Sequence, residues 1–192
     1  MSGEWLLFKQ FLRKPSLIGT VVPSAPALCR ELVNSLELPP GGAAAELGPG
    51  TGVVTLEMLK KMPADFNFFA VELDKLIYQN FRTQFPDTAI VNANAGELDE
   101  LCRSRGIDQL DAVVSGLPWA SFPAEVQDMI LGAVVRSLKS GGRFATFAYL
   151  QGLLLPAARR FRKKLEKEFA VFEISPVVWR NFPPAVVYRC IK

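Results

Sequence analysis

Three glycines at alternate positions follow a short apolar run in the segment Glu46–Gly52, whose sequence is ELGPGTG. Glycines in this arrangement let a strand turn tightly into a helix and let a ligand approach the backbone. A dinucleotide fingerprint would place its third glycine where Val53 stands, and it usually has an apolar residue where Glu46 stands. The segment therefore predicts a site for a nucleoside ligand other than a dinucleotide.

Two polar side chains further along the chain could complete such a site. Glu72 ends the next apolar run, and a carboxylate at that place can accept hydrogen bonds from both hydroxyls of a ribose. Asn94 follows the third run and can accept a hydrogen bond from an adenine amino group. Ser115–Trp119, of sequence SGLPW, follows the fourth run. Because ligands bind at the carboxyl ends of parallel strands, we expect all of these segments at one edge of a sheet.

The residue types that the sequence lacks narrow the chemistry. Histidine is absent, which removes the most common metal ligand and the side chain best suited to proton transfer near pH 7. The three cysteines, Cys29, Cys102 and Cys190, are far apart and odd in number, which indicates neither a disulfide framework nor a zinc site. We expect no metal.

The elements that must position these residues alternate along the chain. Strand-like runs are Ala43–Leu47, Phe68–Glu72, Ala89–Asn92, Asp111–Ser115, Gly142–Phe147, Ala170–Ser175 and Val186–Ile191. Helical patterns are Val53–Met62, Asp74–Phe85, Glu97–Arg105, Ala124–Leu138 and Leu154–Phe169. Such alternation predicts a parallel sheet with helices on both faces. The 192 residues suit one domain, in which two helices within residues 1–36, the second capped by Ser24, cover the ligand site.

Between Ala43 and Phe147 the sequence resembles the class I S-adenosylmethionine-dependent methyltransferases. The resemblance implies an α/β, Rossmann-like fold whose seven-stranded sheet is mostly parallel, with the last strand antiparallel. It implies that Glu46 lies near the methionine moiety of S-adenosylmethionine, Glu72 at the ribose and Asn94 at the adenine. The expected cofactor residues are Ser24, Glu46, Gly48, Gly50, Thr51, Gly52, Glu72, Leu73, Asn94, Ala95 and Ser115. The alternative is a turn that binds nothing, in which these features coincide by accident.

The SGLPW segment resembles the loop of amino methyltransferases such as the rRNA adenine dimethylases. In that loop, backbone carbonyls accept hydrogen bonds from the substrate amine and aim its lone pair at the methyl group. The resemblance implies a catalytic set of Ser115, Gly116, Leu117, Pro118 and Trp119, with Trp119 contacting the methylated amine by cation–π attraction. Presenting an alkyl amine in its neutral form at pH 7 costs about 4.6 kcal/mol, and both burial and a neighbouring cation reduce that cost. Tyr149, just past the fifth strand, could accept or relay the proton, or could simply line the rim.

Three motifs in order resemble the bacterial phospholipid N-methyltransferases, which methylate phosphatidylethanolamine stepwise to phosphatidylcholine. They are Val22–Ser24, Ser115–Pro118 and Arg180–Ala185, and the match spans nearly the whole chain. The sequence departs from that pattern at Trp119 and Asn94, which leaves the amine acceptor open. The resemblance implies an amino phospholipid substrate. Because no apolar run approaches the ~20 residues of a membrane span and no signal peptide is evident, we expect a cytoplasmic protein bound peripherally to the inner membrane face.

Two amphipathic segments would suit an anionic membrane surface. The segment Gly3–Arg13 has an apolar arc with basic flanks. The segment Leu154–Phe169 carries an apolar stripe of Leu154, Phe161, Leu165 and Phe169 beside the basic residues Arg159, Arg160, Arg162, Lys163, Lys164 and Lys167. Either apolar side could instead pack on the protein's own core, and the charges could be a solvated face or could bind RNA.

The leading prediction is therefore N-methylation of an amino phospholipid such as phosphatidylethanolamine. One alternative is an RNA adenine N-methyltransferase; against it, those enzymes usually append a C-terminal helical domain, for which this chain leaves no room, so nucleic acid is not the expected partner. Another alternative is a catalytically silent module that binds S-adenosylmethionine.

Overall fold

The computed structural model describes residues 25–192. The expected helix within residues 3–13, the Val22–Ser24 motif and the cap at Ser24 lie outside the described residues.

Seven strands form one sheet in the order β3-β2-β1-β4-β5-β7-β6. They are β1 (Ala43–Leu47), β2 (Asn67–Glu72), β3 (Ala89–Asn92), β4 (Leu110–Ser115), β5 (Leu138–Tyr149), β6 (Val171–Ile174) and β7 (Ala185–Ile191). The first five strands pair in parallel, whereas β7 is antiparallel to both β5 and β6. The predicted fold class, with its antiparallel last strand, is confirmed.

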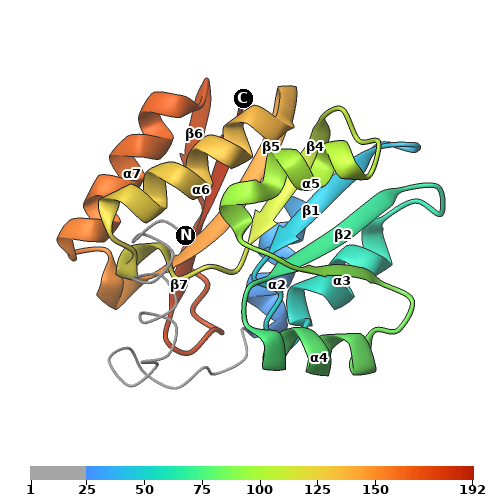
Figure 1. Cartoon of the computed structure of the whole chain (residues 1–192). Helices are drawn as coiled ribbons and strands as arrows, with labels where there is room; N and C mark the ends of the chain where they lie inside the picture. Colours follow the sequence, from blue (N-terminus) through green and yellow to red (C-terminus); the bar gives the residue numbers. More distant parts are fainter. Residues whose placement is uncertain (1–24) are drawn as a thin grey trace.

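Within residues 25–192, helices cover both faces of the sheet, three on each (Figure 1). One face carries α2 (Pro26–Asn34), α3 (Val53–Lys61) and α4 (Lys75–Gln84), and the other carries α5 (Leu98–Ser104), α6 (Ala124–Ser137) and α7 (Pro156–Glu168). Single 3-10 turns follow three of the strands: η2 (Ala95–Glu97), η3 (Trp119–Ser121) and η4 (Leu150–Gly152). Each of these turns redirects the chain at the edge where the parallel strands end.

The central strands β1 and β4 are buried along their whole length. Because both faces of these strands are covered, they consist of nearly continuous apolar residues rather than alternating ones. Leu47 and Val113 pack in the core on the side of α5–α7, and Ala44 and Val114 pack in the core under α2 and α3. This burial fixes the ends of β1 and β4, from which the predicted site segments emerge.

Two sequence expectations need correction. The fifth strand runs from Leu138 rather than from Gly142, because a register shift against β4 lets Gly141 and Gly142 lie within the strand. In the segment Leu154–Phe169, Phe161, Leu165 and Phe169 are buried as the stripe predicts, but Leu154 is 73% exposed. Leu154 precedes the first turn of the helix, which begins at Pro156, and therefore lies off the buried face.

Within residues 25–192, no helix combines the length and the apolarity that crossing a lipid bilayer requires.

Candidate active site

The carboxyl ends of β1, β2 and β4 lie side by side. Leu47 is in register with Val71 on one side and with Ser115 on the other. The N–H of Gly48 donates to the Val71 carbonyl at 2.9 Å, and the N–H of Gly116 donates to the Leu47 carbonyl at 2.9 Å. The structure therefore brings together the glycine turn, the end of β2 and the SGLPW segment, as the sequence predicts.

The glycines of the turn serve two different purposes. A Cβ on Gly48 would lie 2.7 Å from Leu117 Cδ2, and one on Gly52 would lie 2.1 Å from Phe85 Cε2, so both positions are closely packed. All three glycines have a positive φ, which disfavours other residues, but Gly50 differs because a Cβ there would meet nothing within 4 Å. The turn thus presents bare backbone to open space at Gly50, which is what a ligand cradle requires.

A buried carboxyl lies beneath the turn. Glu46 is only 1% exposed, and its Oε2 accepts a hydrogen bond of 2.6 Å from the Thr55 hydroxyl of α3. Burial raises the pKa of Glu46 to about 7, and the nearby charge of Glu72 pushes it in the same direction. No sequence pattern marks Thr55 as the partner of Glu46, since a threonine inside a helix carries no periodic signal. A positively charged ligand group beside Glu46 would favour the ionised form of this carboxyl, and the ionised carboxyl would in turn attract such a group.

The second acidic residue, Glu72, lies at the end of β2. Burial raises the pKa of its carboxyl, and the N–H groups of Asp74, Leu73 and Gly50 partly offset the rise. The Asp74 N–H donates to Glu72 Oε1 at 2.9 Å. Asn92, which the sequence did not mark as a site residue, holds this turn, because its Nδ2 donates to the carbonyls of Glu72 and Leu73 at 2.9 and 3.0 Å. Glu72 therefore stands beside Gly50 on a braced turn.

The expected adenine residue, Asn94, has a local role as well. Its Oδ1 accepts the Gly96 N–H at 2.9 Å and so caps η2. Ala95 is buried, and Leu73 packs against the same hydrophobic core. The side chains of these two expected cofactor residues therefore point toward the core rather than out of the sheet end.

The SGLPW segment is held by its own first and last residues. The fully buried Ser115 hydroxyl accepts the Trp119 indole N–H at 3.0 Å and the Leu117 N–H at 3.3 Å. The Trp119 ring is 2% exposed and stacks on Phe161 of α7, with the ring centroids 4.2 Å apart. The ring therefore lies in the core and braces the loop from behind. A contact between Trp119 and the methylated amine stays a prediction, and this burial argues against it.

Among the described residues, one backbone carbonyl of this segment has no hydrogen-bond donor. The Ser115 carbonyl accepts the Thr146 hydroxyl at 3.0 Å, and the Leu117 and Pro118 carbonyls each accept a backbone N–H at 2.9 Å. No donor from residues 25–192 reaches the carbonyl of Gly116. A Cβ on Gly116 would lie 2.6 Å from the Gly48 carbonyl oxygen, so this residue also touches the glycine turn.

Comparison with known proteins shows the family of this chain. Over 193 residues the sequence is 30% identical to the ornithine lipid N-methyltransferase of Singulisphaera acidiphila, covering 99% of this chain and 96% of that protein. This chain belongs to the same methyltransferase family. It is a class I S-adenosylmethionine-dependent methyltransferase, and its sheet order, with an antiparallel β7, is that of the class.

Two further similarities are more limited. The precorrin-6y C5,15-methyltransferase from Geobacter metallireducens superposes with a TM-score of 0.64 at 20% identity, covering 93% of each chain, and shows the shared fold. The ribosomal RNA small subunit methyltransferase A of Prosthecochloris aestuarii is 34% identical over 70 residues, which cover 36% of this chain and 26% of that protein. No protein-family model matches the sequence.

The residues at the edge of the sheet fit the cofactor of this methyltransferase. S-Adenosylmethionine carries a positive sulfur, an ammonium group and a ribose diol, which match two buried carboxyls whose pKa values are raised by burial. The open space at Gly50 admits the ligand to the backbone. Glu46, Gly50 and Glu72 are thus the residues that we expect to hold the cofactor.

Tyr149 lies at the same edge of the methyltransferase, where β5 ends. Burial raises the pKa of its phenol, and the nearby Cys29 adds to the rise. The phenol therefore keeps its proton at neutral pH and can donate a hydrogen bond, which makes it unsuited to act as an anionic base. Its part in the reaction stays a prediction.

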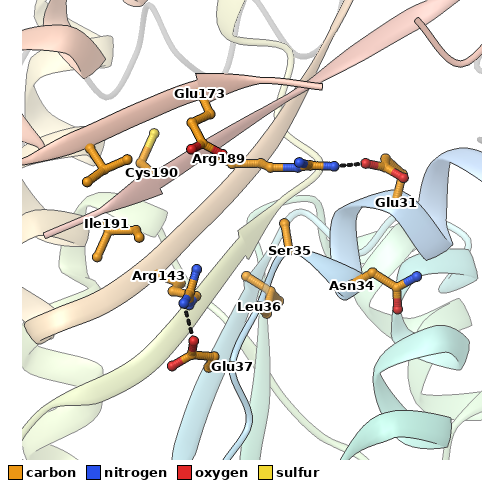
Figure 2. Close-up of a pocket in the computed structure, with 11 residues that line it drawn as sticks. Glu31, Asn34, Ser35, Leu36, Glu37, Arg143, Glu173, Arg189, Cys190 and Ile191 are labelled. Carbon is orange, nitrogen blue, oxygen red and sulfur yellow. Dashed lines mark hydrogen bonds and ion pairs between the residues drawn. The ribbon is translucent and has the colours of Figure 1, made fainter. Parts of the chain in front are cut away.

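Two cavities lie away from this edge. One, of about 320 Å³, is lined by Arg143 and Arg189, which pair with Glu37 and Glu31 (Figure 2). The other, of about 480 Å³, is lined by Lys139 and Asp111, among others. Both lie toward the amino-terminal ends of the parallel strands, opposite the cofactor residues. Within residues 25–192 no three acidic or cysteine side chains are grouped to hold a metal ion.

Proposed function

We propose that this methyltransferase transfers methyl groups to the primary amine of a membrane lipid. The observation that carries the proposal is the similarity, over almost the full length of both chains, to an ornithine lipid N-methyltransferase. The motifs Ser115–Pro118 and Arg180–Ala185 make phosphatidylethanolamine a second candidate. Both lipids offer a primary amine on a polar headgroup, so the same site chemistry serves either one.

The chain's own residues supply orientation rather than a strong base. The bound cofactor supplies a methyl group on a positively charged sulfur. The Gly116 carbonyl accepts an N–H of the amine and holds its lone pair toward the glycine turn, which Gly116 touches. Burial at the edge of the sheet and the adjacent positive charge both favour the neutral amine. Proximity and alignment then provide most of the rate acceleration.

The proposal is tested by following the methyl group. Protein and methyl-labelled S-adenosylmethionine are mixed with vesicles that contain phosphatidylethanolamine, an ornithine lipid or neither, and with ribosomal RNA in a separate reaction. We expect label in one or both amine lipids and none in the other reactions. Label in RNA alone, or cofactor binding without any transfer, would overturn the proposal.

Neutralising Glu72, whose carboxylate is expected to bind the ribose, should weaken cofactor binding. Glu72→Gln keeps the shape of the side chain but loses the charge-assisted hydrogen bonds, each worth roughly 1.5–3 kcal/mol, so calorimetry should show affinity lower by about 10- to 100-fold. Glu100→Gln, on the exposed face of α5, makes the same chemical change and should leave the affinity unchanged. Equal affinities for the two variants would remove Glu72 from the site.

Neutralising the basic face of α7 should weaken binding to anionic vesicles. Arg162 and Lys164 already pair with Glu166 and Asp128, so the expected attraction rests mainly on the exposed Arg159, Arg160 and Lys163. At roughly 1 kcal/mol per charge near the surface, Arg159→Gln with Arg160→Gln should reduce partitioning about 30-fold.

The effect should shrink as salt is added, because salt screens exposed charges. The matched control, Lys60→Gln with Arg103→Gln, removes two exposed charges from α3 and α5. A loss of binding that is equal in both double variants would assign the attraction to net charge rather than to α7.

A further inference from the structure

Large apolar side chains are left exposed in two loops of the molecule. Phe182, Leu154 and Trp179 are 81%, 73% and 72% exposed, and Leu155 is 44% exposed. Covering a side chain of this size is favourable by about 1.5–3 kcal/mol. A cluster of such side chains indicates a surface that becomes covered by a partner or a membrane.

The two loops lie at the edge of the sheet that holds the active site. The first loop connects β5 to α7, and the second, Ser175–Pro184, connects β6 to β7 (Figure 1). The N–H of Leu150 donates to the Pro184 carbonyl at 2.9 Å and joins the loops to each other. A Cβ on Gly152 would lie 3.9 Å from Ala120, which directly follows the SGLPW segment. The exposed side chains thus flank the place where the substrate amine must arrive.

The second loop is fixed in its shape by one buried polar side chain. Asn181 is 2% exposed; its Oδ1 accepts the Ala25 N–H and its Nδ2 donates to the Pro183 carbonyl, both at 2.7 Å. The Val178 N–H donates to the Ala185 carbonyl at 2.8 Å. Trp179 and Phe182 therefore project from either side of an anchored residue.

The charge around these side chains is of one sign. Arg180 is exposed within the second loop, and Arg159 and Arg160 are exposed in the first turns of α7. No acidic residue occurs between Leu150 and Leu165 or between Ser175 and Arg189. Aromatic and leucine side chains with arginines beside them match the composition of surfaces that sit at the headgroup level of a membrane.

We propose that Trp179, Phe182, Leu154 and Leu155 form a membrane-docking surface that inserts into the headgroup region of a lipid bilayer. The surface seats the active-site edge on the membrane, so that a lipid amine reaches the Gly116 carbonyl without leaving the bilayer. This role is distinct from the attraction of α7, which acts at a distance through charge. The choice of a bilayer as the partner rests on the proposed lipid substrate.

Tryptophan fluorescence tests the insertion directly. In a Trp5→Phe variant, Trp179 and the buried Trp119 are the two remaining tryptophans. Vesicles of phosphatidylcholine and phosphatidylglycerol brominated near the headgroup should quench Trp179, and the further substitution Trp179→Phe should abolish that quenching. Unquenched Trp179 on vesicle-bound protein would overturn the proposal, as would a Trp179-dependent dimer in solution that buries the ring.

Binding and activity measurements separate this proposal from that of the substrate. Trp179→Ala with Phe182→Ala should lower vesicle affinity at least about 10-fold, since two apolar side chains are lost. Leu56→Ala with Leu59→Ala, a matched apolar loss on the exposed face of α3, should not. The loop variant should methylate a short-chain, monomeric amine lipid as fast as the native chain does. If the native chain methylates neither lipid form but the quenching of Trp179 persists, the proposed substrate fails while the docking surface stands. If the vesicle affinity of the loop variant equals that of the native chain, the docking surface fails.

Discussion

Glu46→Gln is expected to stabilise the cofactor-free protein above pH 7 and to weaken its binding of S-adenosylmethionine. The folded protein raises the pKa of Glu46 from 4.5 to about 7, mainly because the side chain is fully buried. A carboxyl whose pKa is raised by folding favours the folded state most at low pH, and that contribution is lost as the pH rises from 4.5 through 7. Above pH 7 the buried charge costs about 3 kcal/mol relative to a neutral side chain.

Urea unfolding at several pH values checks the stability part of this prediction. The native chain should lose about 3 kcal/mol of unfolding free energy between pH 4.5 and pH 7.5, beyond the change that other groups cause. The Glu46→Gln variant should lack this component, because its amide does not titrate and its oxygen can still accept the Thr55 hydroxyl. Glu100→Gln, which removes an exposed carboxyl, should follow the native curve. Parallel curves for all three proteins would show that Glu46 titrates normally.

The affinity for S-adenosylmethionine should change with pH in the opposite direction from the stability. A cationic ligand stabilises the ionised carboxyl, so the native affinity for S-adenosylmethionine should rise between pH 6 and pH 8 as Glu46 loses its proton. The variant should bind about 10-fold more weakly at pH 8, with little dependence on pH, because a charge-assisted contact is lost. A more stable protein that binds less well would show that this chain keeps a destabilising carboxyl for the sake of its ligand. Equal affinities at pH 8 would place the positive groups of the cofactor elsewhere.

The parts of the site that could be predicted from the sequence are those that local chemistry determines. The ends of β1 and β4 follow from apolar runs that stop at glycine or serine, and glycines alternate where backbone must meet a ligand. The position of Glu72 beside the turn follows from the rule that parallel strands end at one edge.

The parts that the sequence left open depend on distant partners. The sequence around Trp119 does not distinguish a ring that faces a ligand from a ring that lies in the core. The ring is buried because it stacks on Phe161 of α7, which is distant in the sequence. Thr55 donates one hydrogen bond to Glu46, and Asn92 donates two to the turn at Glu72; such contacts leave no pattern in the sequence. Only packing across the sheet reveals these roles.

Gly116→Ala is expected to abolish most of the methyltransferase activity. The new Cβ would lie 2.6 Å from the Gly48 carbonyl oxygen, well inside contact distance, and both groups are backbone or attached directly to it. The SGLPW segment and the glycine turn must therefore move apart. A displacement approaching 1 Å at a reacting centre can lower the rate about 100-fold, and the added strain should cost roughly 1–3 kcal/mol of stability.

Measuring both activity and folding in a matched glycine variant distinguishes a misplaced site from a damaged fold. Gly152→Ala adds the same methyl group in the neighbouring loop, where its nearest contact would be Ala120 Cβ at an ordinary 3.9 Å. This control should retain its activity and its unfolding free energy. If Gly116→Ala stays folded by circular dichroism and still loses turnover, the contact between the two loops is what aligns amine and methyl group. Full activity in Gly116→Ala would mean that the loops can separate without cost, and the Gly116 carbonyl could then not be the group that orients the amine.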